Sequence, residues 1–284
     1  MTTFLNALYS AIIGIVEGIT EWLPVSSTGH MILLDEILRL KDNVSEDFYS
    51  FFLVAIQLGA ILAVIALFFQ RLNPFSPKKS AVEKKSTWRL WLLVLIGILP
   101  AAIIGIPFDD FIEEHFYGFP VIALALIAYG IAFIVIERKR KNQPNKIESA
   151  EELTPKHALL IGCFQVLSLI PGTSRSGSTI LGGMLLGVSR TVAAEFSFFM
   201  SIPVMLGASL LRGLKYFVGA PAISANEWII LLVGTLVAFV VSFFTIRFLM
   251  DFVKKHSFEV FGWYRIALGV VILIAAACLG KLAF

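Results

Sequence analysis

Two polar, helix-breaking segments interrupt the apolar sequence and hold most of the side chains that could do chemistry. The first runs from residue 17 to residue 30 (EGITEWLPVSSTGH), and the second from residue 171 to residue 179 (PGTSRSGST). Ionisable side chains inside hydrocarbon are costly unless they have partners or water. Clusters of Ser, Thr and Gly that restart a helix present free N–H groups and the positive end of the helix dipole, which suit phosphate. The two segments therefore predict a membrane-embedded site for a phosphorylated ligand.

The first segment contains two glutamates, Glu17 and Glu21, whose i, i+4 spacing puts them on one face of a helix. Two like charges at this spacing repel each other unless a cation or a shared proton joins them. We interpret the pair as ligands of a divalent cation or as an acid and a base. The alternative is that one carboxyl group is neutral and that both only form hydrogen bonds.

Hydroxyl side chains are concentrated in both segments, although a helix N-cap would need only one of them in each. We predict that two such turns, facing each other, form a cradle of hydroxyl and N–H groups that binds phosphate. A serine in the cradle becomes a nucleophile if a base lies within reach, which the spacing alone leaves open. The predicted cradle consists of Ser26, Ser27, Thr28, Thr173, Ser174, Ser176, Ser178 and Thr179.

One histidine and one arginine complete the candidate catalytic residues. His30 follows Ser27 by about one helical turn, which favours acid–base or nucleophilic chemistry over a hydrogen-bonded core histidine. Arg175 lies in a Gly- and Ser-rich turn, and we interpret it as a phosphate ligand that stabilises the transferring charge. A structural ion pair with Glu17 or Glu21 is the alternative for Arg175.

The composition indicates the class of protein. Of the 284 residues, 58% are hydrophobic and 15% are charged, and the mean hydropathy is +0.86. A soluble domain carries about 25% charged residues, so we predict a polytopic α-helical membrane protein. The net charge of +3 is small, and nucleic acid is not an expected partner. Cys163 and Cys278 lie in apolar runs, so we expect buried small side chains rather than a disulfide framework or a metal site.

Six apolar runs are long enough to cross a bilayer, which takes about 20 residues. They cover residues 48–70, 88–108, 119–137, 196–217, 228–249 and 261–281. Two further apolar regions are each broken at a proline, the first into residues 4–23 and 26–38 and the second into residues 157–170 and 179–188. Interrupted segments are tolerated at membrane depth only where they line a cavity or pack against protein. We therefore expect two re-entrant helical hairpins.

The two halves of the sequence resemble each other. Residues 48–60 (FYSFFLVAIQLGA) recur as residues 196–208 (FSFFMSIPVMLGA), and the same offset of 148 aligns Glu17 with Gln165. With a one-residue gap, Ser27 aligns with Ser174. The predicted fold is a single all-α membrane domain with repeat halves at about 1–145 and 155–284, each one re-entrant hairpin plus three transmembrane helices. Because each half crosses an odd number of times, the second must be inverted.

The basic residues predict the orientation of the chain. Most of them fall in loops at about 71–87 and 138–156 and near 247–257, whereas the segment 109–114 (DDFIEE) is acidic. The positive-inside rule places the basic loops in the cytoplasm, both termini outside and the acidic segment in a solvated outer loop. The first ten residues lack a basic segment, so no cleaved signal peptide is expected. The two hairpins then enter from opposite sides, and their turns meet near mid-membrane.

At these residues the chain closely resembles the undecaprenyl-diphosphatase family, the bacitracin-resistance proteins of bacterial membranes. The resemblance runs essentially end to end and rests on two signatures. One is Glu17-x-x-x-Glu21 followed by PVSSTGH at residues 24–30, and the other is the Pro-Gly-x-Ser-Arg-Ser motif in residues 171–179. The resemblance implies a multi-pass protein of the bacterial plasma membrane, with an inverted-repeat fold and a site that opens outward.

The resemblance also implies a reaction, the hydrolysis of undecaprenyl diphosphate to undecaprenyl phosphate and phosphate. This recycles the lipid carrier for peptidoglycan synthesis and confers resistance to bacitracin, which binds the diphosphate. The expected catalytic residues are Ser27, His30, Glu21 and Arg175, with Ser27 as nucleophile and His30 as base or leaving-group acid. Attack by His30 or by activated water are the alternatives. Glu17 and Glu21 are expected to hold Mg²⁺ or Ca²⁺ against the diphosphate.

A transporter or flippase of polyprenyl phosphate is the main alternative function, because inverted repeats with broken helices are typical of secondary transporters. The paired nucleophile and acid–base set favours the enzyme, since binding alone does not need it. The sequence leaves open the metal preference, the prenyl chain length, whether the lipid is also flipped, and the oligomeric state, including a homodimer.

Overall fold

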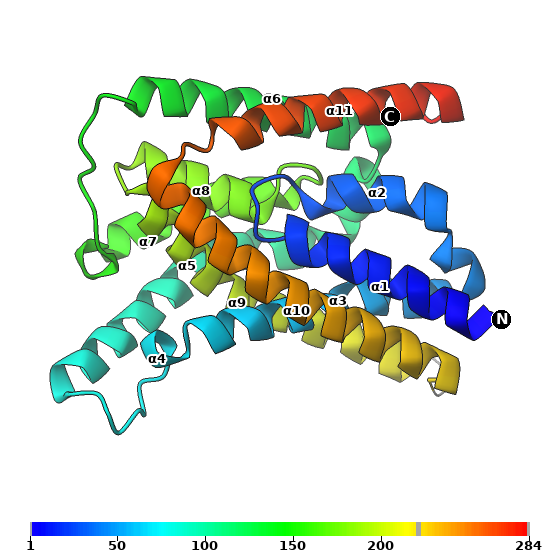
Figure 1. Ribbon diagram of the computed structural model, residues 1–284, viewed down its shortest axis with the longest axis horizontal. Coiled ribbons are helices and arrows are strands. Elements are labelled where there is room, and N and C mark those ends of the chain that lie inside the picture. Colours follow the sequence, from blue (N-terminus) through cyan, green and yellow to red (C-terminus); the bar gives the residue numbers. More distant parts are fainter. Residues whose placement is uncertain (1, 220–222, 283–284) are drawn as a thin grey trace.

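The computed structural model describes residues 2–219 and 223–282, and this part of the chain contains helices and no β-strand (Figure 1). Three short 3₁₀ turns join the α-helices: η1 (Leu40–Asn43), η2 (Ala150–Glu152) and η3 (Leu167–Leu169). The α-helices are α1 (Thr2–Thr20), α2 (Ser27–Leu38), α3 (Glu46–Leu67), α4 (Phe69–Leu72), α5 (Ala81–Phe116), α6 (Phe119–Arg140), α7 (Pro155–Val166), α8 (Arg175–Leu185), α9 (Arg190–Gly219), α10 (Ala225–Lys255) and α11 (Glu259–Leu279).

The long apolar helices confirm that the protein is a multi-pass membrane protein. The six predicted spans coincide with α3, α5, α6, α9, α10 and α11, which are long and apolar enough to cross a bilayer. The helix α1, which we expected in a re-entrant hairpin, also meets this criterion. By contrast, α2, α7 and α8 have 12, 12 and 11 residues. At about 1.5 Å per residue these three helices are too short to span hydrocarbon that is about 30 Å thick.

The helices α1 and α2 form one hairpin and α7 and α8 form the other. The first hairpin lies toward the end of the molecule that carries the N-terminus, and the second lies toward the opposite end (Figure 1). Their connecting turns meet in the middle of the molecule, where side chains from both turns bond to each other. The sequence segments that carry the two motifs are therefore neighbours at mid-depth.

Equivalent contacts hold the two hairpins in place. The helix α1 packs along α10, α7 packs along α5, and α6 packs against α11. Glycines make the first two contacts close: a methyl group on Gly14 would lie 2.6 Å from the Gly234 carbonyl oxygen, and one on Gly162 would lie 2.1 Å from that of Gly97. The offset of 148 that relates Gly14 to Gly162 is the offset of the predicted repeat. The shared offset of these two glycines agrees with the predicted repeat.

Some helix boundaries differ from the prediction. The acidic segment 109–114, expected in a loop, belongs to α5, which continues through Pro100 and Pro107 to Phe116. The same helix begins inside the predicted loop 71–87, because Ser80 and Glu83 form a capping box. The helix α8 begins at Arg175 instead of residue 179, because Ser174 caps it.

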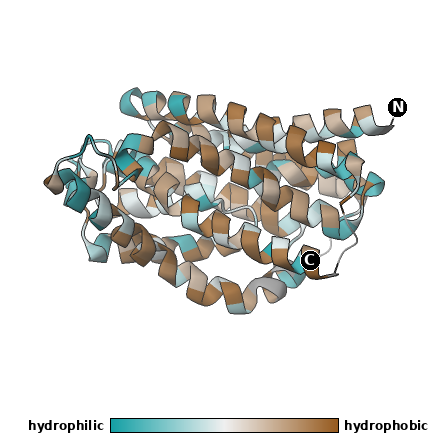
Figure 2. Ribbon diagram, turned by 90° about the horizontal axis from the view of Figure 1, so that it is seen from below, coloured by the Kyte–Doolittle hydropathy of each residue, from teal (hydrophilic) through white to brown (hydrophobic). Residues whose placement is uncertain are grey.

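Polar residues mark the ends of the molecule. The connections between α4 and α5, α6 and α7, and α10 and α11 lie at the end remote from the N-terminus (Figure 1). Hydrophilic residues gather mainly at this end, whereas the middle of the molecule is mostly hydrophobic (Figure 2). Cys163 and Cys278 are exposed, contrary to our expectation. In a membrane protein an apolar run also faces lipid, so an apolar context does not imply burial in protein.

Candidate active site

Two serines in the same backbone conformation start the two inner helices. Ser26 (φ 71°) caps α2 and accepts a hydrogen bond from the Gly29 N–H at 3.3 Å, while Ser174 (φ 70°) caps α8 and accepts one from the Gly177 N–H at 3.1 Å. The structure thus pairs Ser26 with Ser174 by the ungapped offset of 148. The gapped alignment, which paired Ser27 with Ser174, is wrong at this position, because the cap geometry defines the equivalent residues.

The carboxylate of Glu21 joins the two turns. It accepts a hydrogen bond from the Ser27 hydroxyl at 2.9 Å on one oxygen and from the Arg175 guanidinium at 3.0 Å on the other. Ser27 and Arg175 occupy the first position of α2 and of α8, respectively. The side chains of Glu21 and Arg175 are 8% and 10% exposed, so this ion pair lies in the protein interior. A hydroxyl, a carboxylate and a guanidinium from two distant segments are therefore connected.

Arg175 is held on three sides. Besides Glu21, it donates to the Ser197 carbonyl oxygen at 3.0 Å, and its guanidinium carbon lies 5.9 Å from the centre of the buried Trp22 ring. Its Nε–H is buried and has no hydrogen-bond partner in the described part of the chain. Buried donors are usually satisfied, so this N–H is a candidate donor to a bound anion.

Glu17 lies one helical turn before Glu21 and is 3% exposed. Its Oε1 is buried and has no hydrogen-bond partner among the described residues. Glu17 interacts electrostatically with both Glu21 and Arg175. A buried carboxylate oxygen without a donor is the kind of group that a cation or a proton satisfies.

His30 is bonded to different partners from Ser27. Its Nδ1 lies 2.7 Å from the Ser26 carbonyl oxygen, and its Nε2 lies 2.7 Å from the hydroxyl of Tyr264 on α11. Its ring stacks on that of Tyr264, with the centroids 5.7 Å apart. Within the described residues no hydrogen bond joins His30 to Ser27. The hydroxyl of Ser27 therefore faces Glu21, and the imidazole faces α11.

Most other hydroxyls of the predicted cradle support the turns. Ser176 donates to the carbonyl oxygens of Glu21 and Leu23, so it ties the second turn to the first. The remaining bonds join Thr173 to Leu167 and Ile170, Ser174 to Ser176, Ser178 to Tyr129, and Thr179 to Ser197. Thr28 is half-buried, and its hydroxyl makes no hydrogen bond to the described residues.

A buried arginine outside the two motifs, Arg265, holds both turns. The guanidinium of Arg265 is fully buried and donates to the carbonyl oxygens of Pro24, Gly172 and Thr173 at 2.8–3.1 Å. It also lies over the ring of Tyr129, 5.4 Å from the centroid. One signal was available in the sequence: Arg265 is the only basic residue between Glu259 and Leu279. A lone charge in such a run must be paired inside the protein.

Comparison with known proteins bears on what this site does. The profile described as "Bacitracin resistance protein BacA" matches residues 10–271, which is most of the chain. The chain belongs to the BacA family. Curated relatives named undecaprenyl-diphosphatase include that of Enterococcus faecalis, which is 55% identical over 95% of this chain and 97% of its own length. That of Limosilactobacillus fermentum is 52% identical over 97% of this chain and 99% of its own length. Undecaprenyl-diphosphatase 1 of Clostridioides difficile is 56% identical over 96% of this chain and 98% of its own length.

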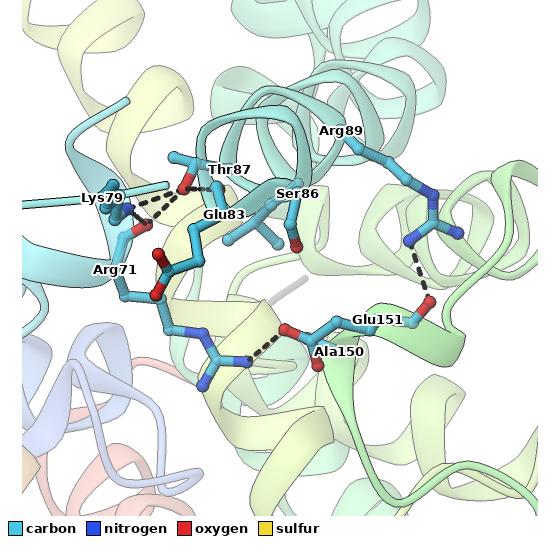
Figure 3. A pocket seen from close by; sticks show the side chains of 9 residues that line it. Arg71, Lys79, Glu83, Ser86, Thr87, Arg89, Ala150 and Glu151 are labelled. Atoms are coloured by element: carbon cyan, nitrogen blue, oxygen red, sulfur yellow. Dashed lines mark hydrogen bonds and ion pairs between the residues drawn. The ribbon is translucent and has the colours of Figure 1, made fainter. Parts of the chain in front are cut away.

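Two cavities of this BacA-family chain lie outside the turns. One, of about 200 Å³, is at the basic end between α4, the start of α5 and η2 (Figure 3). Its charges are engaged: Arg71 pairs with Glu195 at 2.5 Å, and Arg89 donates to the Glu151 carbonyl oxygen at 2.9 Å. The other, of about 500 Å³, is lined by residues of α2, η1, α3 and α9, including Asp35 and Tyr49. Neither is lined by a residue of the predicted site.

Proposed function

We propose that this chain hydrolyses undecaprenyl diphosphate to undecaprenyl phosphate and inorganic phosphate, and so recycles the lipid carrier of peptidoglycan synthesis. The observation that carries the proposal is the bridge from Ser27 through Glu21 to Arg175. It places a nucleophile, a base and a cation in one buried group, which simple binding of a lipid does not require. The names of the relatives and of the family agree with this activity and with bacitracin resistance.

The bond to Glu21 favours Ser27 as the nucleophile. Its Oγ attacks the terminal phosphorus, its proton passes to the Glu21 carboxylate, and the bond from phosphorus to the bridging oxygen breaks. Undecaprenyl phosphate leaves with the electron pair of that bond. Water then attacks the phosphoserine, and phosphate departs as Ser27 regains its proton. Attack by His30 or by water alone remains the alternative that a trapping experiment can separate.

Arg175 and the two helix N-termini provide the positive charge that phosphoryl transfer needs. The transferred group gathers negative charge on its oxygens, and fixed donors lower the barrier because they need no rearrangement. The helices α2 and α8 both begin at the turns, so their N-terminal dipoles point toward the same region. The unpartnered Nε–H of Arg175 is an additional donor for this group.

The residues partly fit the expected divalent cation. Glu17 has a buried carboxylate oxygen without a partner, but the described residues contain no group of three acidic, His or Cys side chains that could hold a metal alone. Oxygens of the diphosphate would have to complete the coordination of Mg²⁺ or Ca²⁺ at Glu17 and Glu21. Such a cation would neutralise part of the diphosphate charge. Removal of metal by EDTA, followed by return of Mg²⁺ or Ca²⁺, tests this assignment.

Phosphate release from undecaprenyl diphosphate by the purified protein in detergent tests the activity. We expect Ser27→Ala and Arg175→Ala to reduce turnover by about two orders of magnitude or more. The matched controls are Ser201→Ala, which removes a buried hydroxyl bonded to the Phe198 carbonyl, and Arg138→Ala, which removes an exposed ion pair with Glu259. Binding of the lipid without phosphate release by folded wild-type protein would instead indicate the transporter.

Trapping with substrate labelled in its terminal phosphate identifies the nucleophile. Acid-stable label at Ser27 is expected after rapid quenching. Acid-labile label at His30 would transfer the role to the imidazole, and the absence of label from an active enzyme would favour direct attack by water.

The orientation follows from the positive-inside rule, and we propose that the basic end faces the cytoplasm and that both termini lie outside. The site would then open outward. In a background where the exposed Cys163 and Cys278 are replaced by serine, a membrane-impermeant thiol reagent applied to intact cells should label Lys41→Cys and leave Lys78→Cys unlabelled. Labelling of Lys78→Cys alone would reverse the orientation.

A further inference from the structure

We propose that Tyr264 positions His30 for catalysis, by fixing the imidazole ring and the proton on it. This inference rests on the proposed function, because it concerns the same reaction. Both ring nitrogens of His30 have a hydrogen-bond partner. Nδ1 contacts the backbone carbonyl of Ser26, and Nε2 contacts the hydroxyl of Tyr264.

The backbone partner determines the tautomer of the neutral ring. A carbonyl oxygen can only accept, so the contact of 2.7 Å with Ser26 requires the proton on Nδ1. In the neutral ring Nε2 then carries the lone pair, and it accepts from the Tyr264 hydroxyl. The carbonyl belongs to the cap residue whose φ is 71°, so the local backbone that starts α2 also orients the histidine. The reactive nitrogen of His30 is therefore Nε2, on the side of α11.

Tyr264 is itself held in place. It precedes Arg265, whose guanidinium is bonded to carbonyl groups of both turns, so this part of α11 is anchored to the site. Its ring lies nearly parallel to the imidazole, with an interplanar angle of 11°. Tyr264 is 47% exposed, so the contact lies at an accessible edge of the site rather than in the core. Adjacent residues of one helix thus fix the turns and the histidine.

The surroundings contain few other groups that could govern the charge of His30. On α11, Arg265 acts on His30 electrostatically. In the turn after α1, the carboxylate of Glu21 is already bonded to Ser27 and Arg175. On α6, the residue that faces the start of α2 is Leu126, and the charged residues of that helix begin at Glu137. Tyr129 of α6 is bonded to Ser178.

The contact between His30 and Tyr264 separates the role of His30 from that of Ser27. Ser27 and Glu21 face each other on one side of the turn, and His30 and Tyr264 face each other on the other. Because His30 is not the partner of Ser27, it is available to the departing phosphate as a proton donor or as a positive charge when Nε2 is protonated. Tyr264 keeps the ring from rotating away from this position. In this arrangement Tyr264 is a positioning residue that acts through His30.

The substitution Tyr264→Phe removes the hydroxyl and keeps the aromatic ring that stacks on His30. The substitution Tyr264→Leu removes both the hydroxyl and the ring. The Tyr264 hydroxyl donates to Nε2 of the neutral imidazole and turns to accept from Nε2–H of the imidazolium, so the two protonation states bond to it with different strength. A net hydrogen bond of about 0.5–1.5 kcal/mol corresponds to about 0.4–1 pH unit. We expect Tyr264→Phe to shift the titration midpoint of His30 by up to this amount, measured by NMR of ¹⁵N-imidazole-labelled protein. The His30 signal is assigned by its loss in His30→Ala.

Turnover provides the second measurement. Tyr264→Phe should lower kcat by about two- to twelve-fold with KM unchanged, and should move the histidine-dependent limb of the pH–rate profile with the NMR midpoint. Tyr264→Leu should lower kcat further. The control is Tyr9→Phe, which removes a half-buried tyrosine hydroxyl on α1 and should leave both measurements unchanged.

The outcomes separate this inference from the proposed function. If wild-type protein releases phosphate and Tyr264→Phe changes neither the His30 midpoint nor the pH profile, the positioning role is overturned and the phosphatase stands. If the midpoint shifts but wild-type protein releases no phosphate under any metal condition, the contact exists and the proposed function fails. An equal loss of kcat at every pH, without a change in the midpoint, would mean that Tyr264 is only structural.

Discussion

Ser26 and Ser174, 148 positions apart, adopt the same positive-φ conformation and cap their helices through the same contact. An L side chain at such a φ costs about 1–3 kcal/mol, so this conformation persists only where the surroundings enforce it. In both turns the next residue, Ser27 or Arg175, is directed by this geometry toward Glu21. Strain in the backbone is thus located where the candidate chemistry is.

Replacement of either cap serine by glycine separates the energetic cost of the positive φ from the stabilisation that the capping hydrogen bond provides. Ser26→Gly relieves the positive φ and loses only a few tenths of a kcal/mol of capping, whereas Ser26→Ala loses about 1 kcal/mol and keeps the strain. We therefore expect Ser26→Gly to be more stable than Ser26→Ala by about 1 kcal/mol or more, in thermal unfolding of the detergent-solubilised protein. Ser45 caps α3 with φ −68°, so the Gly and Ala variants there should lack this extra difference. An equal difference at Ser45 would contradict the role of strain.

Glu21→Gln should separate the chemistry from the fold. The amide keeps the shape and can still accept from Arg175, but it cannot take a proton from Ser27. We expect kcat to fall by about 100-fold or more, because the base for Ser27 is lost. Glu137→Gln is the matched control, since Glu137 is also buried and bonded to an arginine, Arg190, away from the turns. Equal losses of activity in both variants would argue against a chemical role for Glu21.

Arg265→Leu should destabilise the protein strongly. It leaves three buried carbonyl oxygens without their donor, each of which costs about 1–3 kcal/mol. We expect a loss of about 3 kcal/mol or more in the free energy of unfolding, together with loss of activity. Arg138→Leu removes an arginine whose side chain is 62% exposed and should change stability by less than about 1 kcal/mol. Similar thermal unfolding of the two variants would show that the contacts of Arg265 contribute little.

The close contact between α1 and α10 is testable with one methyl group. Gly14→Ala would place a Cβ 2.6 Å from the Gly234 carbonyl oxygen, and the helices must separate to admit it. We expect a destabilisation of about 1–3 kcal/mol. Gly207→Ala adds the same methyl group where no atom lies within 4 Å, so stability should be unchanged or slightly higher. Unchanged unfolding of Gly14→Ala would mean that the contact is loose.

The long helices and the two motifs could be predicted because their signals are local. Continuous apolar runs predicted the six spans, and the polar turns predicted that the two motifs meet: Ser27 and Arg175 are each bonded to Glu21. The partners of single groups could not be predicted in this way. The contact of His30 with Tyr264 spans 234 positions, and that of Arg265 with Pro24 spans 241. Such pairs depend on how α11 packs, which no short pattern records.

The three bonds of Arg265 also bear on how the site meets the two sides of the membrane. Arg265 belongs to the second half of the chain, yet it holds carbonyl groups from the turns of both halves. A displacement of one hairpin against the other would leave these carbonyls unbonded in a fully buried place. The two hairpins are therefore coupled mechanically and are expected to move as one rigid body. Substrate entry and phosphate release should then occur on the same side of the membrane during a turnover.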